Sequence, residues 1–269
     1  MAKPLLDDEL WLLIEPLLPV RERRFRFPGR KAVDDRRCLT GILFVLRTGT
    51  PWEYLPKELN CGSGMTCWRR LRDWKEAGVW EKLHLLLLER LNRSDQIDWS
   101  RAAVDSTSIA RSARGKKSGP NPTDRSRPGS KHHLVVDGNG VPLAAILSAA
   151  NENDVTKLFA LIDAIPAVAG RVGRPRFRPE CVYGDRAYDS TWHRSVLNAL
   201  GIRTRIAMRG EAHGSGLGKI RWVVERTNSW LHQYRRLRVR FEKRADIHEA
   251  FLQLACAHIC WKQIKHSLC

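Results

Sequence analysis

The spacing of apolar residues changes once along this chain, and that change constrains the fold more than any other feature. Before residues 92–95, leucines recur at helical spacing, as between Leu10 and Leu17. After that point, short segments rich in β-branched residues alternate with helical segments. The sequence therefore predicts a small all-helical domain over residues 1–95, followed by a mixed α/β domain over residues 96–269.

The front domain is predicted to contain four helices, and the third, over residues 65–75, has an unusual composition. It places Trp68 and Trp74 among three arginines, namely Arg69, Arg70 and Arg72. Aromatic and arginine side chains on one helix are typical of a DNA-reading helix in a helix-turn-helix-like domain. The alternative is that both tryptophans belong to the core and the arginines are solvated.

The second domain is predicted to hold a mixed sheet of about five strands with flanking helices. The expected strands are residues 102–107, 133–137, 141–147, 181–185 and 203–207, and the second and third form a hairpin around a glycine turn. A glycine-rich loop at 210–218 precedes a long helix from about residue 219, and an apolar helix from about 247 to 264 follows.

The balance of charge points to a polyanionic partner. The chain has 47 Lys and Arg against 29 Asp and Glu, a net charge of +18. Residues 20–37, 111–133 and 220–244 contribute +5, +6 and +6. Any one basic run can be a solvated face, but three arginine-rich segments favour phosphate contact. A membrane partner is not expected, since the apolar runs are far shorter than the roughly 20 residues that span a bilayer.

The cysteines predict neither a disulfide framework nor a metal site. The chain has seven, an odd number without paired spacing, and no secretory signal peptide is visible at its start. We expect reduced thiols in a cytoplasmic protein. Cys256 and Cys260 lie one helical turn apart and could suggest zinc, but two small apolar residues on a buried helix face explain them better.

Three carboxylates stand out in this basic chain. Asp105 and Asp185 are each expected at or near the end of a predicted strand, and Glu225 lies at the edge of the apolar stripe of the long helix. Three carboxylates on such elements would form an oxygen site for two Mg²⁺ or Mn²⁺ ions, which together catalyse in-line phosphoryl displacement. The alternative for each is an ordinary salt bridge. The residues on the same side of the helix as Glu225 are Arg221, Asn228, Ser229 and His232.

At these residues the chain resembles the DDE transposases of bacterial insertion sequences, and family five most closely. "AVDSTSIARSARG" is similar to the first-aspartate motif, "VYGDRAYDS" to the second, and "RWVVERTNSWLHQYRRLRVRFEK" to the glutamate motif, while "GILFVLRTGTPWEYLP" is similar to the N-terminal domain. The resemblance implies an RNase H-like catalytic domain, two divalent metal ions and Asp105, Asp185 and Glu225 as the catalytic, metal-binding residues.

Two positions depart from the family pattern. Gly218 replaces a tyrosine that often precedes the family arginine, here Arg221, and His232 replaces a lysine that often follows the glutamate. A mostly neutral histidine is a weaker phosphate ligand than lysine. The residues expected to contact DNA are Arg69, Arg70, Arg72, Lys116, Lys117, Lys131, Arg221, Arg226, His232, Arg235 and Arg236.

The predicted activity is transposition. The protein would bind the terminal inverted repeats of its element, cleave the ends and join the 3′-hydroxyls to target DNA, acting as a homodimer or larger assembly at the bacterial nucleoid. A metal-dependent nuclease or resolvase on the same fold would share the three carboxylates. A DNA-binding regulator without catalysis would use them only as salt-bridge partners.

Overall fold

Polar side chains cap the N-termini of α1, α2 and α3 in the front part. The computed structural model describes residues 4–22, 25–26, 29, 31–111, 115–208, 210 and 218–267. The front elements are α1 (Asp8–Ile14), η1 (Glu15–Leu17), α2 (Asp35–Thr48), η2 (Trp52–Tyr54), η3 (Lys57–Leu59), α3 (Gly64–Glu76) and α4 (Val79–Arg93). The carboxylate of Asp34 caps α2 by accepting the Arg37 N–H at 3.0 Å. Gly49, with φ of +74°, ends the same helix.

The connection between α2 and α3 is longer than that of a simple helix-turn-helix. It covers residues 49–63 and contains η2 and η3, whereas the motif uses a turn of about three to four residues. Trp74 is buried and meets Trp80 edge to face, with ring centroids 5.9 Å apart. Trp68 is half-buried and packs below the guanidinium of Arg72. The core interpretation therefore holds for Trp74, while Trp68 is partly buried and packs against the edge of the same core.

The second part contains a mixed sheet with helices on its faces. Its elements are β1 (Ala102–Arg111), β2 (Gly119–Pro120), β3 (Pro128–Asp137), β4 (Pro142–Ala149), η4 (Asp154–Lys157), α5 (Leu158–Asp163), β5 (Cys181–Gly184), η5 (Arg186–Tyr188), α6 (Thr191–Ala199), β6 (Arg203–Ile206), α7 (Gly218–His232), α8 (Arg235–Arg238), β7 (Val239–Arg240) and α9 (Ala245–Ser267). Most of the predicted 210–218 loop, residues 211–217, lies outside the described residues.

The sheet has the strand order that an RNase H-like domain requires. Antiparallel β4, β3 and β1 are followed by β5 and β6, which run parallel to β1. These are the five predicted strands. In the described part of the chain, the two-residue strands β2 and β7 extend the sheet to seven strands, beside β3 and β1 respectively. Parallel β5 and β6 need a helical crossover, and α6 supplies it.

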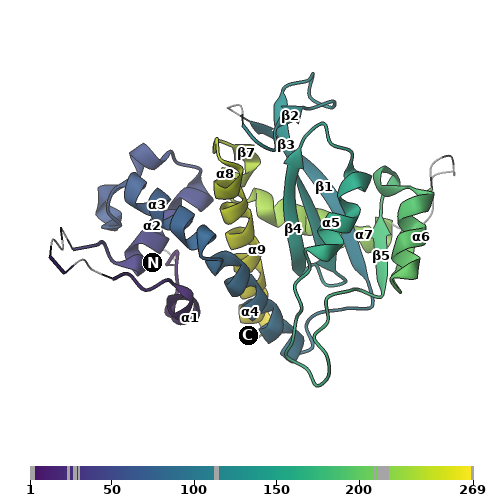
Figure 1. The fold of residues 1–269 in the computed structure, drawn as a ribbon, viewed down its shortest axis with the longest axis horizontal. Helices are drawn as coiled ribbons and strands as arrows, with labels where there is room; N and C mark the ends of the chain where they lie inside the picture. Colours follow the sequence, from purple (N-terminus) through teal and green to yellow (C-terminus); the bar gives the residue numbers. More distant parts are fainter. Residues whose placement is uncertain are drawn as a thin grey trace.

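The last helix, α9, lies between the two parts of the molecule. Figure 1 shows it beside α4, with the small helices on one side and the sheet on the other. It packs against α3, α4 and β4. Its buried residues include Phe251, Cys256 and Cys260, so both cysteines lie in the core, as the apolar interpretation predicts. One hydrophobic core runs through both parts, and the boundary at residue 95 remains a prediction.

No helix in the described ranges is long and apolar enough to cross a membrane.

Candidate active site

Two of the predicted carboxylates meet where β5 ends beside β1, although Asp105 lies within β1, which continues to Arg111, rather than at its end as predicted. β1 and β5 are parallel, with Ala103 opposite Tyr183. Continuing that register by two residues places Asp105 of β1 beside Asp185, which follows β5 directly. Strand pairing alone therefore brings together two residues that lie 80 positions apart in the sequence.

Helix α7 crosses this end of the sheet and directs two polar side chains toward the aspartates. It packs on β1, β3 and β5. A terminal nitrogen of Arg221 lies 4.0 Å from Asp105 Oδ1 and 3.9 Å from Asp185 Oδ2. Seven residues later, about two helical turns, the Asn228 amide donates a 2.9 Å hydrogen bond to Asp105 Oδ2. One guanidinium thus faces both carboxylates, and one amide fixes the orientation of the first.

Burial changes the acidity of the first aspartate. Burial raises the pKa of Asp105 to about 6, because the charged carboxylate loses hydration. Hydrogen bonds from the Ser106 backbone and from Asn228, and the charge of Arg221, oppose this rise in pKa, while the charge of Asp185 adds to it. Asp185 is more open, and its Oδ1 accepts the Ala187 N–H at 2.9 Å, which caps η5.

The third predicted carboxylate does not join the pair in this structure. Glu225 follows Arg221 by four residues on α7, about 40° further around the helix, and its side chain is exposed. Among the described residues, no group of three or more His, Cys, Asp and Glu side chains is arranged to hold a metal ion. The predicted three-carboxylate cluster is therefore not assembled. A third carboxylate next to two others is repelled and is better solvated in water.

Several of the predicted DNA-contact residues are exposed. Arg69 on α3, Lys116 and Lys117 in the loop before β2, and Arg235 on α8 all reach solvent. Lys117 also pairs with Glu249 at 2.6 Å, and Arg72 pairs with Asp73 at 2.6 Å.

Two of the predicted DNA-contact arginines are structural instead. Arg70 is 3% exposed, pairs with Asp35 at 2.6 Å and donates a hydrogen bond to the Val33 carbonyl. Arg236 is 5% exposed and pairs with Glu242 at 2.6 Å. Both guanidinium groups are buried and paired with a carboxylate inside the protein, so neither fits the predicted role at a DNA surface.

The other predicted DNA-contact residues already interact with protein groups or lack a charge. Arg226 is stacked between the rings of Trp222 and Trp230, at 4.4 and 4.7 Å from their centroids. Lys131 pairs with Asp154 at 2.8 Å. His232 is half-buried, and burial, followed by the charge of Arg238, lowers its pKa, so it is neutral at pH 7.

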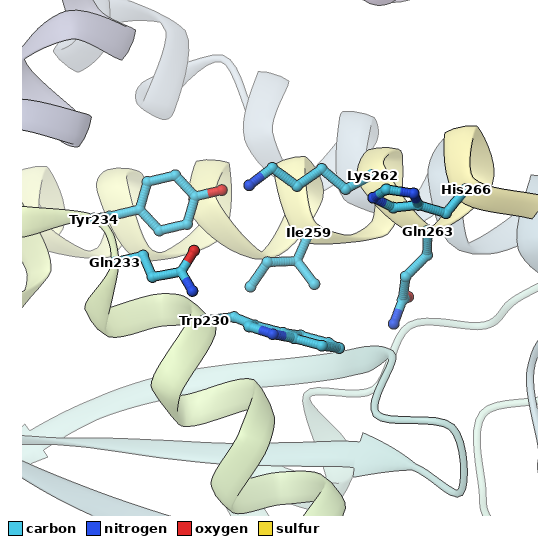
Figure 2. A pocket seen from close by; sticks show the side chains of 7 residues that line it. All are labelled: Trp230, Gln233, Tyr234, Ile259, Lys262, Gln263 and His266. Carbon is cyan, nitrogen blue, oxygen red and sulfur yellow. The ribbon is translucent and has the colours of Figure 1, made fainter.

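A cavity of about 230 Å³ on α7 is separate from this site. Figure 2 shows it between α7 and α9, with the Trp230 ring and the Lys262 side chain in its wall. Trp230 follows Arg221 by nine residues, which is half a turn out of phase on a helix. The cavity therefore opens on the opposite side of α7 from the two aspartates.

Sequence reasoning assigned no role to Asn228. Its spacing from Arg221 already placed it on the same side of the helix. The sequence did not show that the side of α7 carrying Asn228 faces β1 rather than solvent.

The comparisons with known proteins agree with this architecture. Residues 6–84 match a family described as "Putative transposase of IS4/5 family", and residues 99–260 match a family described as "Transposase DDE domain". The second match covers more than half of the chain.

Two relatives from Burkholderia cepacia are similar in sequence. One, named "Putative transposase for insertion sequence element IS402", is 63% identical over 151 residues, covering 56% of this chain and 72% of the relative. The other, "Insertion element IS402 uncharacterized 16.2 kDa protein", is 63% identical over 123 residues, which cover 45% of this chain and 84% of the relative.

Among solved structures, the Mos1 strand transfer complex aligns with 89% of this chain and 81% of its own, with 12% identity and a TM-score of 0.27. A simian T-cell lymphotropic virus intasome aligns with 51% of this chain and 39% of its own, with 20% identity and a TM-score of 0.31. The family matches, together with the sequence identity to the IS402 protein, establish that the chain belongs to the DDE transposases of insertion sequences.

Proposed function

We propose that this protein cleaves DNA at the ends of its element and joins the resulting 3′-hydroxyls to target DNA. The observation that carries the proposal is the placement of Asp105 and Asp185 around one cationic group, Arg221, where β5 ends beside the parallel strand β1. Such a pair suits chemistry in which charge on a phosphodiester must be neutralised.

Two divalent ions, Mg²⁺ or Mn²⁺, suit these residues. Carboxylate oxygens of both aspartates already face a common positive charge, and hard cations prefer such oxygen donors. When bound, the ions would supply an activated water and stabilise the attacking and leaving oxygens. Asp105 and Asp185 would hold them, and Glu225 would complete the site by turning inward from α7, since a cation removes the repulsion among the carboxylates.

The protein residues would then act by positioning. Asn228 holds Asp105 in one orientation through its amide. Arg221 is released toward a DNA phosphate, which its planar guanidinium binds bidentately. His232, neutral at pH 7, would contribute a hydrogen bond rather than a charge where relatives often carry lysine.

Duplex DNA, as terminal repeats and as target, is the proposed partner. The exposed cations Arg69, Lys116, Lys117 and Arg235 are the strongest candidates for phosphate contact. Two element ends must be processed together, so we propose a homodimer or larger assembly on DNA. The proposed location is the bacterial nucleoid, in the cytoplasm.

The test is cleavage of a duplex that carries the element's end, in Mg²⁺. Asp105→Asn and Asp185→Asn should each abolish cleavage while DNA binding persists. Asp163→Asn, an exposed carboxylate at the end of α5, is the matched control and should cleave normally. Full cleavage by Asp105→Asn would refute the assignment.

A strand-transfer assay separates the proposed function from its alternatives. Joining of donor 3′ ends into a plasmid supports a transposase. Nicking without joining would instead indicate a metal-dependent nuclease or resolvase. Binding without any Mg²⁺-dependent cleavage would indicate a regulator that uses the carboxylates only as salt-bridge partners.

A further inference from the structure

The loop between α5 and β5 carries a dense group of arginines that the catalytic site does not use. Residues 171–178 contain four arginines and no acidic residue, and every one of the eight is exposed. We call this segment the arginine loop; its arginines are Arg171, Arg174, Arg176 and Arg178. Outside residues 20–37, 111–133 and 220–244, the net charge of the chain is close to zero. A sum over those regions therefore does not reveal the positive charge of this loop.

The arginine loop is held firmly at its base. Val168 and Arg176 exchange two backbone hydrogen bonds of 2.8 and 2.9 Å. The Asn92 amide at the end of α4 donates to the Ala169 carbonyl at 2.8 Å. Gly170 has φ of +104°, and a Cβ there would lie 2.5 Å from the Glu89 carbonyl oxygen, so the chain passes close to α4 (lower part of Figure 1).

Two of the arginine side chains are also held in place by aromatic rings. The Arg176 guanidinium lies over the Trp99 ring at 5.6 Å, and that of Arg178 lies over Phe177 at 5.0 Å. Side chains held against rings lose less conformational freedom when a ligand binds. Arg176 donates to Glu180 and Arg178 donates to the Leu200 carbonyl, and both guanidinium groups keep further N–H donors for an anion.

The surrounding charges do not balance this group. Arg203 on β6 adds a fifth arginine, with 73% of its side chain exposed. Asp95 pairs with Arg171, and Glu180 pairs with Arg176 and Arg203. Five arginines against these two carboxylates leave a charge of +3. In the described part of the chain, neither Arg174 nor Arg178 forms an ion pair.

The arginine loop lies away from the catalytic aspartates. It precedes Cys181, the first residue of β5, whereas Asp185 follows the last. Four strand residues separate the two ends by about 13 Å, at roughly 3.3 Å per residue. We propose that the arginine loop is a second DNA-binding surface, which holds the phosphate backbone of duplex DNA outside the catalytic site.

The test is the salt dependence of binding to a duplex that lacks the element's ends, measured without divalent metal. Each phosphate contact contributes about 0.9 to the slope of log K against log salt. Arg174→Gln with Arg178→Gln should therefore reduce the slope by about 1.8. Arg174→Lys with Arg178→Lys retains both charges and should keep the wild-type slope.

A matched control removes two charges elsewhere. Lys82→Gln with Lys265→Gln changes an exposed lysine of α4 and one that pairs with Glu9, and it should leave the slope unchanged. The proposal is overturned if the slope for Arg174→Gln with Arg178→Gln equals the slope for Lys82→Gln with Lys265→Gln. A change in oligomeric state by light scattering, with no change in slope, would instead assign this surface to pairing between copies of the chain.

This experiment is independent of catalysis. It uses neither metal nor an element end, so it remains informative whether or not Asp105→Asn abolishes cleavage.

Discussion

The side-chain amide of Asn228 on α7 donates a 2.9 Å hydrogen bond to Oδ2 of Asp105 on β1. The bond joins the helix of the glutamate motif to the strand of the first-aspartate motif, 123 residues away. Hydrogen bonds to a charged acceptor contribute about 1.5–3 kcal/mol. We therefore regard Asn228 as the positioning residue of Asp105.

Asn228→Ala should change the pH dependence of cleavage. Loss of the amide removes a contact that lowers the pKa of Asp105, so the acidic limb of the rate profile should move up by about one to two units, at 1.36 kcal/mol per unit. The measurement is cleavage rate against pH. Ser229→Ala, at an exposed neighbour, should leave the profile in place. An unshifted acidic limb in Asn228→Ala would show that the amide does not act through Asp105.

Asp105→Asn should stabilise the fold at neutral pH. The pKa of Asp105 is about 6 when folded, against 3.8 as its ordinary value. The folded state therefore binds the extra proton, and stability falls as pH rises from about 4 to 6. The substitution should raise the free energy of unfolding by on the order of 2–3 kcal/mol at pH 8, and by little below pH 4.

Chemical denaturation at both pH values measures this effect. Asp163→Asn is the control, because it measures how the free energy of unfolding changes when an exposed negative charge is removed from this basic protein. A gain for Asp105→Asn that is the same at pH 4 and pH 8 would contradict the linkage.

Arg221→Gln should strengthen divalent metal binding in the absence of DNA. The guanidinium lies about 4 Å from both aspartates and competes with a metal ion for the same negative charge. Coulomb energies of about 1–4 kcal/mol at this separation predict a roughly fivefold or greater increase in Mn²⁺ affinity. Mn²⁺ titration followed by electron paramagnetic resonance measures it.

The control is Arg226→Gln on the same helix, where the guanidinium stacks between Trp222 and Trp230. It should leave Mn²⁺ affinity unchanged. If both variants bind Mn²⁺ like the wild type, the Arg221 guanidinium does not compete for the aspartates.

Arg236→Met should destabilise the protein by about 3–5 kcal/mol. It leaves Glu242, 6% exposed, without its partner in the interior, and removes hydrogen bonds to the carbonyls of Gly49 and Thr50. Arg236→Met with Glu242→Leu should recover much of the loss, because neither member of the ion pair is then left as an unpaired charge.

Arg235→Met, at the exposed adjacent position, should change stability by less than about 0.5 kcal/mol. Denaturant midpoints distinguish these variants. Equal midpoints for the Arg235 and Arg236 variants would exclude a structural role for the buried pair.

The fold could be predicted from the sequence further than the site could. Alternating apolar segments identified the five main strands. They also placed Asp105 and Asp185 near strand ends and so brought them together, although β1 in fact continues beyond Asp105 to Arg111. The two-residue strands β2 and β7 were missed because so short a segment has no period of its own.

Side-chain environments were harder to predict. A basic run shows its net charge but not which arginine is buried, so Arg70 and Arg236 could not be distinguished from Arg69 and Arg235. The outward position of Glu225 follows from repulsion and hydration, which residue spacing does not contain.

The position of α9 has a consequence for how the chain folds during synthesis. Residues 245–267 complete the core against α4 on one side and β4 on the other. Until the ribosome has made residues 245–267, the nascent chain exposes the apolar surfaces of α4 and β4 that α9 will cover. The core of the second half is therefore complete only after the ribosome has made α9. Unfinished polypeptides would accordingly be targets for chaperones and proteases rather than active recombinases.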